Sequence, residues 1–220
     1  MGADAQRYKV VYQGGEGEIV EKKSRFIATV QPVASEAEAA AFIGAVRKKY
    51  WDASHNCSAF TIGRKHELTR CSDDGEPSGT AGRPMLDVLL REDIHNAAVV
   101  VTRYFGGTLL GTGGLVRAYQ KCTQEGLAGA VIIEKQQGWI LEMGTDYNGL
   151  GKIQYLLAQR KIPVLHTEYT DKVAIQVMVP TELKGEFAKA VTEATSGTAA
   201  LDWGTQAEFA LIAGEVRIFT

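Results

Sequence analysis

Residues 96–115, NAAVVVTRYFGGTLLGTGGL, decide the fold of the first half of the chain. The run AAVVV is continuous, apolar and rich in β-branched residues, which is typical of a strand covered on both faces. Five of the nine residues 106–114 are glycine. Residues 115–129 then place Tyr119 and Cys122 on one apolar side at helical spacing. The stretch therefore predicts a buried strand, a glycine-rich turn and an amphipathic helix.

Capping residues and periodicity predict the elements around this stretch. In chain order they are a strand at 25–33, a helix from a Ser35-x-x-Glu38 capping box, a strand at 53–62, a charged connection at 64–70, a turn-rich loop at 71–82 and a helix from Pro84 to about Glu92.

The pattern resets after a strand at 131–135. The later elements are a strand at 139–143, a helix capped by Asp146, strands at 164–169 and 172–179, a helix capped by Thr181 and a strand at 198–203. This strand-helix-strand-strand-helix-strand order is that of a ferredoxin-like split βαβ sandwich. We therefore predict an α+β protein with two domains, residues 1–134 and 135–220, in which the tail 208–220 adds an edge strand.

Composition limits the class of protein. The chain is 45% hydrophobic and 23% charged, the range of an ordinary globular protein, and its formal net charge of −2 provides no overall field that attracts nucleic acid. Three cysteines without a CxxC spacing predict reduced thiols in a cytoplasm rather than disulfides. No apolar run reaches the ~18 residues that span a bilayer. A cytoplasmic protein with no membrane partner is expected.

Charge is distributed unevenly around the glycines. No Asp or Glu occurs between His95 and Cys122, whereas basic residues do. Backbone N–H groups of a glycine turn at a helix start can approach phosphates, and aromatic rings beside it can stack on bases. The candidate anion or nucleic-acid site comprises Arg103, Tyr104, Gly106, Gly107, Gly111, Gly113, Gly114, Arg117 and Lys121. Glycines that pack a helix against a sheet explain the composition equally well, so both interpretations stay open.

A second motif, SDDGEPSGTAG at residues 72–82, is acidic. Its carboxylates Asp73, Asp74 and Glu76 are the oxygen ligands that Mg²⁺ prefers, but they are also good caps and turn formers. Because no fourth ligand is identifiable, no metal site is assigned.

The remaining histidines and cysteines carry no assignment. His55 and Cys57 share one face of a strand, where packing is expected rather than a zinc site or a nucleophile pair. The other three histidines, His66, His95 and His166, are isolated in the sequence.

The motifs together resemble the IMPACT family, in the layout of its bacterial, YigZ-type members. They are KSRFI at 23–27, HNC at 55–57, SDDGEPSGTAG at 72–82, PML at 84–86 and RYFGGTLLGTGGLVRAY at 103–119. The resemblance implies a first domain like ribosomal protein S5 domain 2. It implies a second domain that is ferredoxin-like and similar to the last domain of translocation elongation factors.

For function, the resemblance implies regulation of translation. In the eukaryotic members this role is competition with a partner that activates an initiation-factor kinase, and it accompanies a different second domain, so it is not carried over. For bacterial members the suggestion is binding of nucleic acid or the ribosome. The family provides no catalytic residues to transfer.

Three functions follow from these residues. The expected one is a non-enzymatic, translation-associated regulator that binds RNA, the ribosome or a translation factor and needs no cofactor. The alternative is a phosphate-handling enzyme that binds Mg-nucleotide on residues 106–114, with Mg²⁺ on Asp73, Asp74 or Glu76. The third is a module that docks a protein partner.

Overall fold

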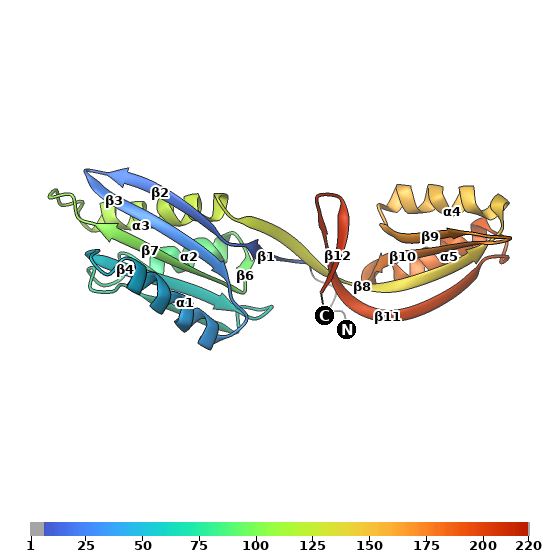
Figure 1. Cartoon of the computed structure of the whole chain (residues 1–220), viewed down its shortest axis with the longest axis horizontal. Helices are drawn as coiled ribbons and strands as arrows, with labels where there is room; N and C mark the ends of the chain where they lie inside the picture. The colour runs from blue at the N-terminus through green and yellow to red at the C-terminus, as the bar shows by residue number, and fades with distance from the viewer. Residues whose placement is uncertain (1–6, 220) are drawn as a thin grey trace. The chain divides into compact units, whose positions relative to one another are not determined.

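The computed structural model describes residues 7–219, which form two units (Figure 1). The amino-terminal unit holds residues 8–133, and the carboxy-terminal unit holds residues 134–219 together with Arg7. Each unit has its own hydrophobic core between strands and helices. The predicted α+β architecture with two domains is therefore confirmed.

The amino-terminal unit is built on a five-stranded sheet. Its elements are β1 (Tyr8–Gln13), β2 (Gly15–Glu21), β3 (Ser24–Pro32), α1 (Glu36–Lys49), β4 (His55–Ile62), β5 (Leu68–Ser72), α2 (Gly82–Arg91), β6 (Ile94–His95), β7 (Ala97–Tyr104) and α3 (Thr112–Ala128). The strands run in the order β2-β3-β7-β4-β5, and all neighbours are antiparallel. A short parallel pair, β1 with β6, accompanies the sheet.

The central strand β7 is covered on both faces, as the apolar run predicts. Val99 and Val101 lie in the core beneath α2 and α3, whereas Ala98 and Val100 pack with Phe42 of α1. Figure 1 shows α1 on one side of the sheet and α2 and α3 on the other. Residues 105–111 connect the end of β7 to the start of α3.

The carboxy-terminal unit has the element order that the sequence predicts. Its elements are β8 (Val131–Thr145), α4 (Tyr147–Arg160), β9 (Val164–Tyr169), β10 (Val173–Pro180), a 3-10 turn (Thr181–Leu183), α5 (Lys184–Ala194), β11 (Ala200–Ile212) and β12 (Glu215–Phe219). The antiparallel order β11-β8-β10-β9 is that of a split βαβ sheet. In the described part of the tail, residues 208–212 continue β11 and pair with β12 as a hairpin, so β12 is the added edge strand.

Several local expectations were wrong. β1 and β2 occupy residues for which no element was predicted, and β5 replaces part of the expected charged connection. The two strands expected at 131–135 and 139–143 are one continuous strand, β8. Thr181 begins a 3-10 turn and does not cap α5, whereas Ser35 and Asp146 cap α1 and α4 through their side-chain oxygens.

The length and composition of the described helices bear on membranes. Among them, none combines the length and the apolar character that a membrane span requires.

Candidate functional site

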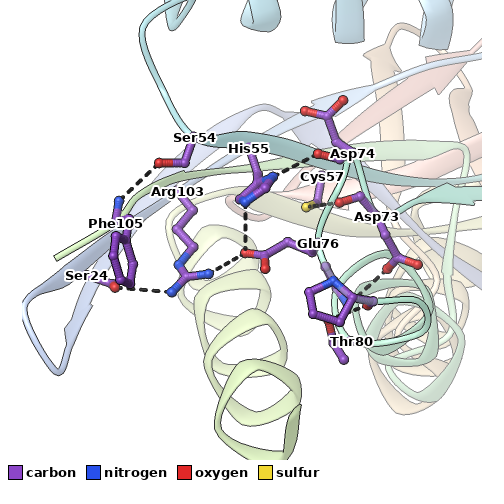
Figure 2. A network of polar contacts seen from close by, with 12 residues as sticks. Ser24, Ser54, His55, Cys57, Asp73, Asp74, Glu76, Thr80, Arg103 and Phe105 are labelled. Atoms are coloured by element: carbon purple, nitrogen blue, oxygen red, sulfur yellow. Dashed lines mark hydrogen bonds and ion pairs between the residues drawn. The ribbon is translucent and has the colours of Figure 1, made fainter. Parts of the chain in front are cut away.

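A buried ion pair lies where the acidic motif meets the end of β7. Nη1 of Arg103 donates to Oε1 of Glu76 at 2.6 Å, and the two side chains are only 6% and 3% exposed. The hydroxyl of Tyr119, on α3, donates to the same Oε1 at 2.8 Å. Nη2 of Arg103 donates to Oγ of Ser24 at 3.3 Å (Figure 2). One carboxylate thus joins a loop, the central strand and a helix.

His55 extends this network toward the strand β4. Its Nε2 lies 3.9 Å from Oε1 of Glu76, and its Nδ1 lies 2.8 Å from the carbonyl oxygen of Asp74 (Figure 2). Because a carbonyl oxygen only accepts, Nδ1 carries the hydrogen in the neutral ring, and Nε2 then has its lone pair toward the ion pair. The predicted packing role of His55 is compatible with this placement at the edge of a hollow.

Cys57 is held in the same region but is chemically inert. Its Sγ lies 2.9 Å from the carbonyl oxygen of Asp73 and 3.3 Å from the hydroxyl of Tyr119. Burial raises the pKa of Cys57 to about 12 and also raises the pKa of Tyr119, which in addition lies near Cys57 and Glu76. Both groups are therefore protonated at neutral pH, and Cys57 is no activated nucleophile.

The carboxylate of Asp73 organises its own loop. It accepts hydrogen bonds from the backbone N–H groups of Gly79, Ala81 and Gly82 at 2.8, 3.0 and 2.8 Å. Burial acts to raise its pKa, but these three donors outweigh burial, so the pKa of Asp73 is lowered. The second two donors belong to the start of α2, which Asp73 caps from nine residues upstream.

The carboxylate of Asp74 also binds groups of this chain. Its Oδ2 accepts the backbone N–H of Asn56 at 2.6 Å, and its Oδ1 pairs with Nη2 of Arg47 at 2.8 Å. Together with the pairing of Glu76, all three carboxylates of the acidic motif bind groups of this chain rather than converging on one point. The geometry of the described residues therefore gives the Mg²⁺ candidates no shared site.

A hollow of about 440 Å³ opens beside the ion pair. Its lining is mostly apolar and includes Phe105, Leu109, Leu110 and Leu115, with His55, Glu76 and Arg103 as polar members. The guanidinium carbon of Arg103 lies 5.5 Å from the ring centroid of Phe105, a cation–π contact. We call this the apolar hollow. Phe105 is 48% exposed and Leu109 82% exposed, so both present apolar surface to solvent.

A second hollow of about 240 Å³ lies at the first turns of α3. Its charged lining residues are Lys22, Arg117 and Lys121, opposed by a single carboxylate, Glu21. We call this the basic hollow. Leu110 lines both hollows, so residues 106–114 form the wall between them.

The predicted glycines divide into two kinds. Gly107 and Gly111 have φ of 79° and 74°, and a Cβ on either would meet nothing within 4 Å, so they serve open turns. Gly106 instead lies directly against the backbone of Lys23, where a side chain has no room. Gly113 and Gly114 form the first turn of α3, whose N-cap Gly111 provides no side-chain cap.

The predicted charged and aromatic residues are not all on one surface. Arg117 and Lys121 are exposed and lie together in the basic hollow. Arg103 is buried and its charge is neutralised by Glu76, so the expectation that it contributes a free positive charge is wrong. Tyr104 is partly exposed, and its hydroxyl donates to Asp52 at 2.9 Å.

One contributor and one pairing were not predicted from the sequence. Lys22 lines the basic hollow from the turn between β2 and β3, and its position there follows only from the pairing of these two strands. The pairing of Glu76 with Arg103 was not predicted, although the sequence contains a signal that the side chain of Arg103 is buried. Arg103 continues the alternation of Val99 and Val101, which face the core beneath α2 and α3.

Comparison with known proteins agrees with the two-unit structure. Residues 22–127 match the model of the Impact N-terminal domain, and residues 144–198 match a domain of unknown function, DUF1949. A crystal structure described only as that of a hypothetical protein superposes with a TM-score of 0.57 at 32% identity and covers 89% of this chain and 96% of that one.

Relatives over most of the chain carry one family name. The IMPACT family member YvyE of Bacillus subtilis (strain 168) is 42% identical over 86% of this chain and 88% of its own length. The IMPACT family member YigZ of Escherichia coli (strain K12) is 35% identical over 80% of this chain and 88% of its own length. These matches confirm the resemblance carried by the acidic and glycine-rich motifs, and the chain belongs to the IMPACT family.

Proposed function

We propose that this protein is a non-enzymatic regulator in the cytoplasm that acts in translation by binding single-stranded RNA. The observation that carries the proposal is the pair of hollows on either side of residues 106–114. One offers positive charge and the other an exposed aromatic ring, the two features with which proteins bind single-stranded nucleic acid.

The basic hollow supports binding of phosphate. Arg117 and Lys121 lie four residues apart on α3 and are exposed, and Lys22 adds a third cation from the β2–β3 turn. A Cβ on Gly113 would lie 3.7 Å from Nη1 of Arg117, which brings this guanidinium over the first turn of α3. The N–H groups and the dipole of that turn add partial positive charge.

The apolar hollow supports binding of a base. Phe105 is half-exposed, with Arg103 near its ring and Leu109 beside it. Every base has a π-face, so a single aromatic ring next to phosphate ligands gives affinity without sequence preference. Because Leu110 lines both hollows, one strand of RNA can place a phosphate on one side of the wall and a base on the other.

The enzyme alternative loses support from the same geometry. A phosphate-transfer reaction needs Mg²⁺ held beside the nucleotide, but Asp73 binds three backbone N–H groups, Asp74 binds Asn56 and Arg47, and Glu76 binds Arg103. A protein partner is the remaining alternative, since Leu109 presents an exposed apolar side chain at the rim.

Fluorescence anisotropy with a labelled single-stranded RNA oligomer and the full chain tests the proposal. The logarithm of affinity should fall linearly with the logarithm of salt, by about 0.7 per phosphate contact. Arg117→Ala with Lys121→Ala should reduce the steepness of that line by about 1.4, two contacts' worth. The matched control, Lys48→Ala with Arg91→Ala, removes the same charge from exposed helical positions of the same unit and should leave the slope unchanged.

The outcomes separate the alternatives. Absence of RNA and ribosome binding at low salt overturns the proposal. Equal losses in both double variants also overturn it, because binding would then follow net charge alone. Co-purification with a translation factor that survives nuclease and high salt assigns the surface to a protein partner instead.

A further inference from the structure

Three metal-ligating side chains far apart in the sequence meet at one place in the amino-terminal unit. They are His66, in the connection between β4 and β5, Asp93, between α2 and β6, and His95, on β6. One ligand atom from each lies within 4.8 Å of the others. Such a cluster of two imidazoles and a carboxylate occurs once among the residues that the structure describes.

The hydrogen bonds of His95 are the first evidence. Its Nδ1 lies 3.1 Å from the carbonyl oxygen of Gly63, and its Nε2 lies 3.0 Å from Oδ1 of Asp93. Both oxygens only accept, whereas a neutral imidazole has one donor and one acceptor nitrogen. With Nδ1–H bound to Gly63, the lone pair of Nε2 faces a carboxylate oxygen, and a cation between them resolves this conflict. An imidazole N–H bound to a backbone carbonyl is also how metal-bound histidines are oriented.

The carboxylate serves both histidines. Oδ1 of Asp93 lies 3.0 Å from Nε2 of His95 and 3.5 Å from Nε2 of His66. Two ligand atoms bound to one tetrahedral metal at 2.0–2.1 Å lie about 3.3 Å apart. The two distances that join the carboxylate to the imidazoles are therefore already those of a metal site.

The ring of His66 is free to turn and complete the metal site. Its ring stacks on that of His95 with centroids 3.9 Å apart and an interplanar angle of 13°. Metal binding requires both rings to be neutral, and two neutral rings stack at this separation without charge repulsion. Nδ1 of His66 is buried and has no hydrogen-bond partner among residues 7–219. A rotation of this ring toward a metal therefore breaks no hydrogen bond at Nδ1.

Three residues in and beside the cluster have unfavourable backbone conformations. His66, Asp93 and Asn96 have φ of 52°, 55° and 52°, which residues with a side chain adopt rarely. The side chain of Asn96 accepts the N–H of Gly63 at 2.7 Å and so helps to hold the backbone of the residue whose carbonyl contacts His95. Strained non-glycine residues that cluster in this way are typical of functional sites.

We propose that His66, Asp93 and His95 bind a divalent transition metal, Zn²⁺ first among them, through two Nε2 atoms and a carboxylate oxygen. Imidazole with carboxylate suits Zn²⁺ better than Mg²⁺ or Ca²⁺, which take oxygen ligands. Three protein ligands leave a fourth position for water or an exogenous ligand. His95 is 5% exposed and Asp93 58% exposed, so the site is anchored in the core and open to solvent at the carboxylate.

The test is a titration of the untagged, chelator-treated full chain with Zn²⁺ alone, in competition with a chromophoric chelator. Exposed Cys71 can bind Zn²⁺ by itself, so Cys71→Ser is the background for every variant. We expect one Zn²⁺ per chain and a rise in Tm with Zn²⁺ concentration. His66→Ala and Asp93→Asn should each weaken binding more than tenfold, since changes behind metal ligands already cost 10–100-fold. His166→Ala, at an exposed position of β9, is the matched control and should bind as the background does.

His66 and Asp93 are the residues to substitute because their side chains are more exposed than that of His95. Their variants should therefore fold, and a loss of affinity can be attributed to the lost ligand. Failure of the background chain to bind one Zn²⁺ overturns the proposal. Affinity in His66→Ala equal to that of His166→Ala overturns it as well. Neither result bears on RNA binding, because none of the three residues lines the two hollows.

Discussion

Nη1 of Arg103 and Oε1 of Glu76 are 2.6 Å apart in the interior of the amino-terminal unit, and this pair connects the two sequence motifs of the family. Glu76 belongs to the acidic motif, and Arg103 opens the glycine-rich one. The shared oxygen also accepts from Tyr119 of α3. The pair thus fixes the acidic loop to the start of the glycine-rich motif, and it keeps the charges of Arg103 and Glu76 away from the surface.

Glu76→Gln leaves Arg103 as a buried charge without a counter-ion. Breaking a buried pair by removing one partner costs about 3–5 kcal/mol, far more than the loss of an exposed pair, which costs about 0–1 kcal/mol. Urea unfolding measures the difference. Glu18→Gln is the control, since Glu18 pairs with Arg25 at 2.8 Å where both side chains are about half-exposed. Equal destabilisation by the two variants would contradict the structural role of the Arg103–Glu76 pair.

Asp73 should make stability depend on pH in the acid range. Three backbone donors overcome burial and lower its folded pKa below the unfolded value of about 3.9. Its stabilisation is therefore present above pH 4 and is lost as pH falls through the folded pKa. Asp73→Asn should reduce the free energy of unfolding at pH 7 by about 2 kcal/mol.

Urea unfolding across pH 2–7 checks the sign of the effect. The gap between the wild type and Asp73→Asn should narrow below pH 4, while exposed Asp171→Asn should show no gap at any pH. A gap that stays constant down to pH 2 would show that the ionised carboxylate is not what binds the three N–H groups.

The three thiols should differ sharply in reactivity. Burial raises the pKa of both Cys57 and Cys122 to about 12 and closes them to reagents, whereas Cys71, whose pKa partial burial also raises, is exposed on β5. A disulfide reagent at pH 8 should label one thiol of the folded chain rapidly and three after unfolding, because the thiolate is the reactive form. Cys71→Ser should abolish the rapid phase; rapid labelling of two thiols in the wild type would contradict the burial of the other two.

The strand β7 and its flanking helices were predictable because their signals are local. A continuous β-branched run followed by a glycine-rich turn gives β7, and the capping oxygens of Ser35 and Asp146 mark the starts of α1 and α4. The start of β2 gave no such signal, since residues 13–18 read QGGEGE, a composition that strands avoid. Its glycines are explained only by tertiary structure: Gly15 and Gly17 lie against the backbone of α3 at Gly129 and Glu125.

The candidate site was predictable as two motifs but not as an arrangement. Arg103 and Glu76 are 27 residues apart, and nothing in the spacing shows that their charges neutralise each other. The basic hollow needs Lys22, which the β2–β3 turn brings to α3. His66 and His95 are isolated in sequence yet stack in space, because the β4–β5 connection and β6 meet. Long-range placement, rather than local preference, assembles all three.

Two glycine substitutions should have opposite effects. A Cβ on Gly17 has no room beside the backbone of Glu125 and Gly126, so Gly17→Ala should separate β2 from α3 and destabilise the amino-terminal unit by at least about 2 kcal/mol. Gly44 lies within α1 with nothing within 4 Å of the added methyl group, so Gly44→Ala should stabilise by about 0.5–1 kcal/mol through helix propensity. Thermal unfolding of both variants measures the contrast, and a loss of stability in Gly44→Ala would refute the assignment of free space there.

Phe105 distinguishes RNA binding through phosphate and base from binding through charge alone. Its half-exposed ring lines the apolar hollow across the wall from Arg117 and Lys121. Loss of one stacked base costs about 1–3 kcal/mol, so Phe105→Ala should weaken RNA affinity about 5- to 150-fold without changing the salt slope, and Phe105→Trp should retain it. Tyr155→Ala, which removes a 67% exposed ring from α4, should bind as the wild type does.

If Phe105→Ala binds normally while Arg117→Ala with Lys121→Ala does not, the contact is with phosphates only. The apolar hollow then takes no part in RNA binding, because an exposed ring beside a bound strand contributes to affinity whenever a base reaches it.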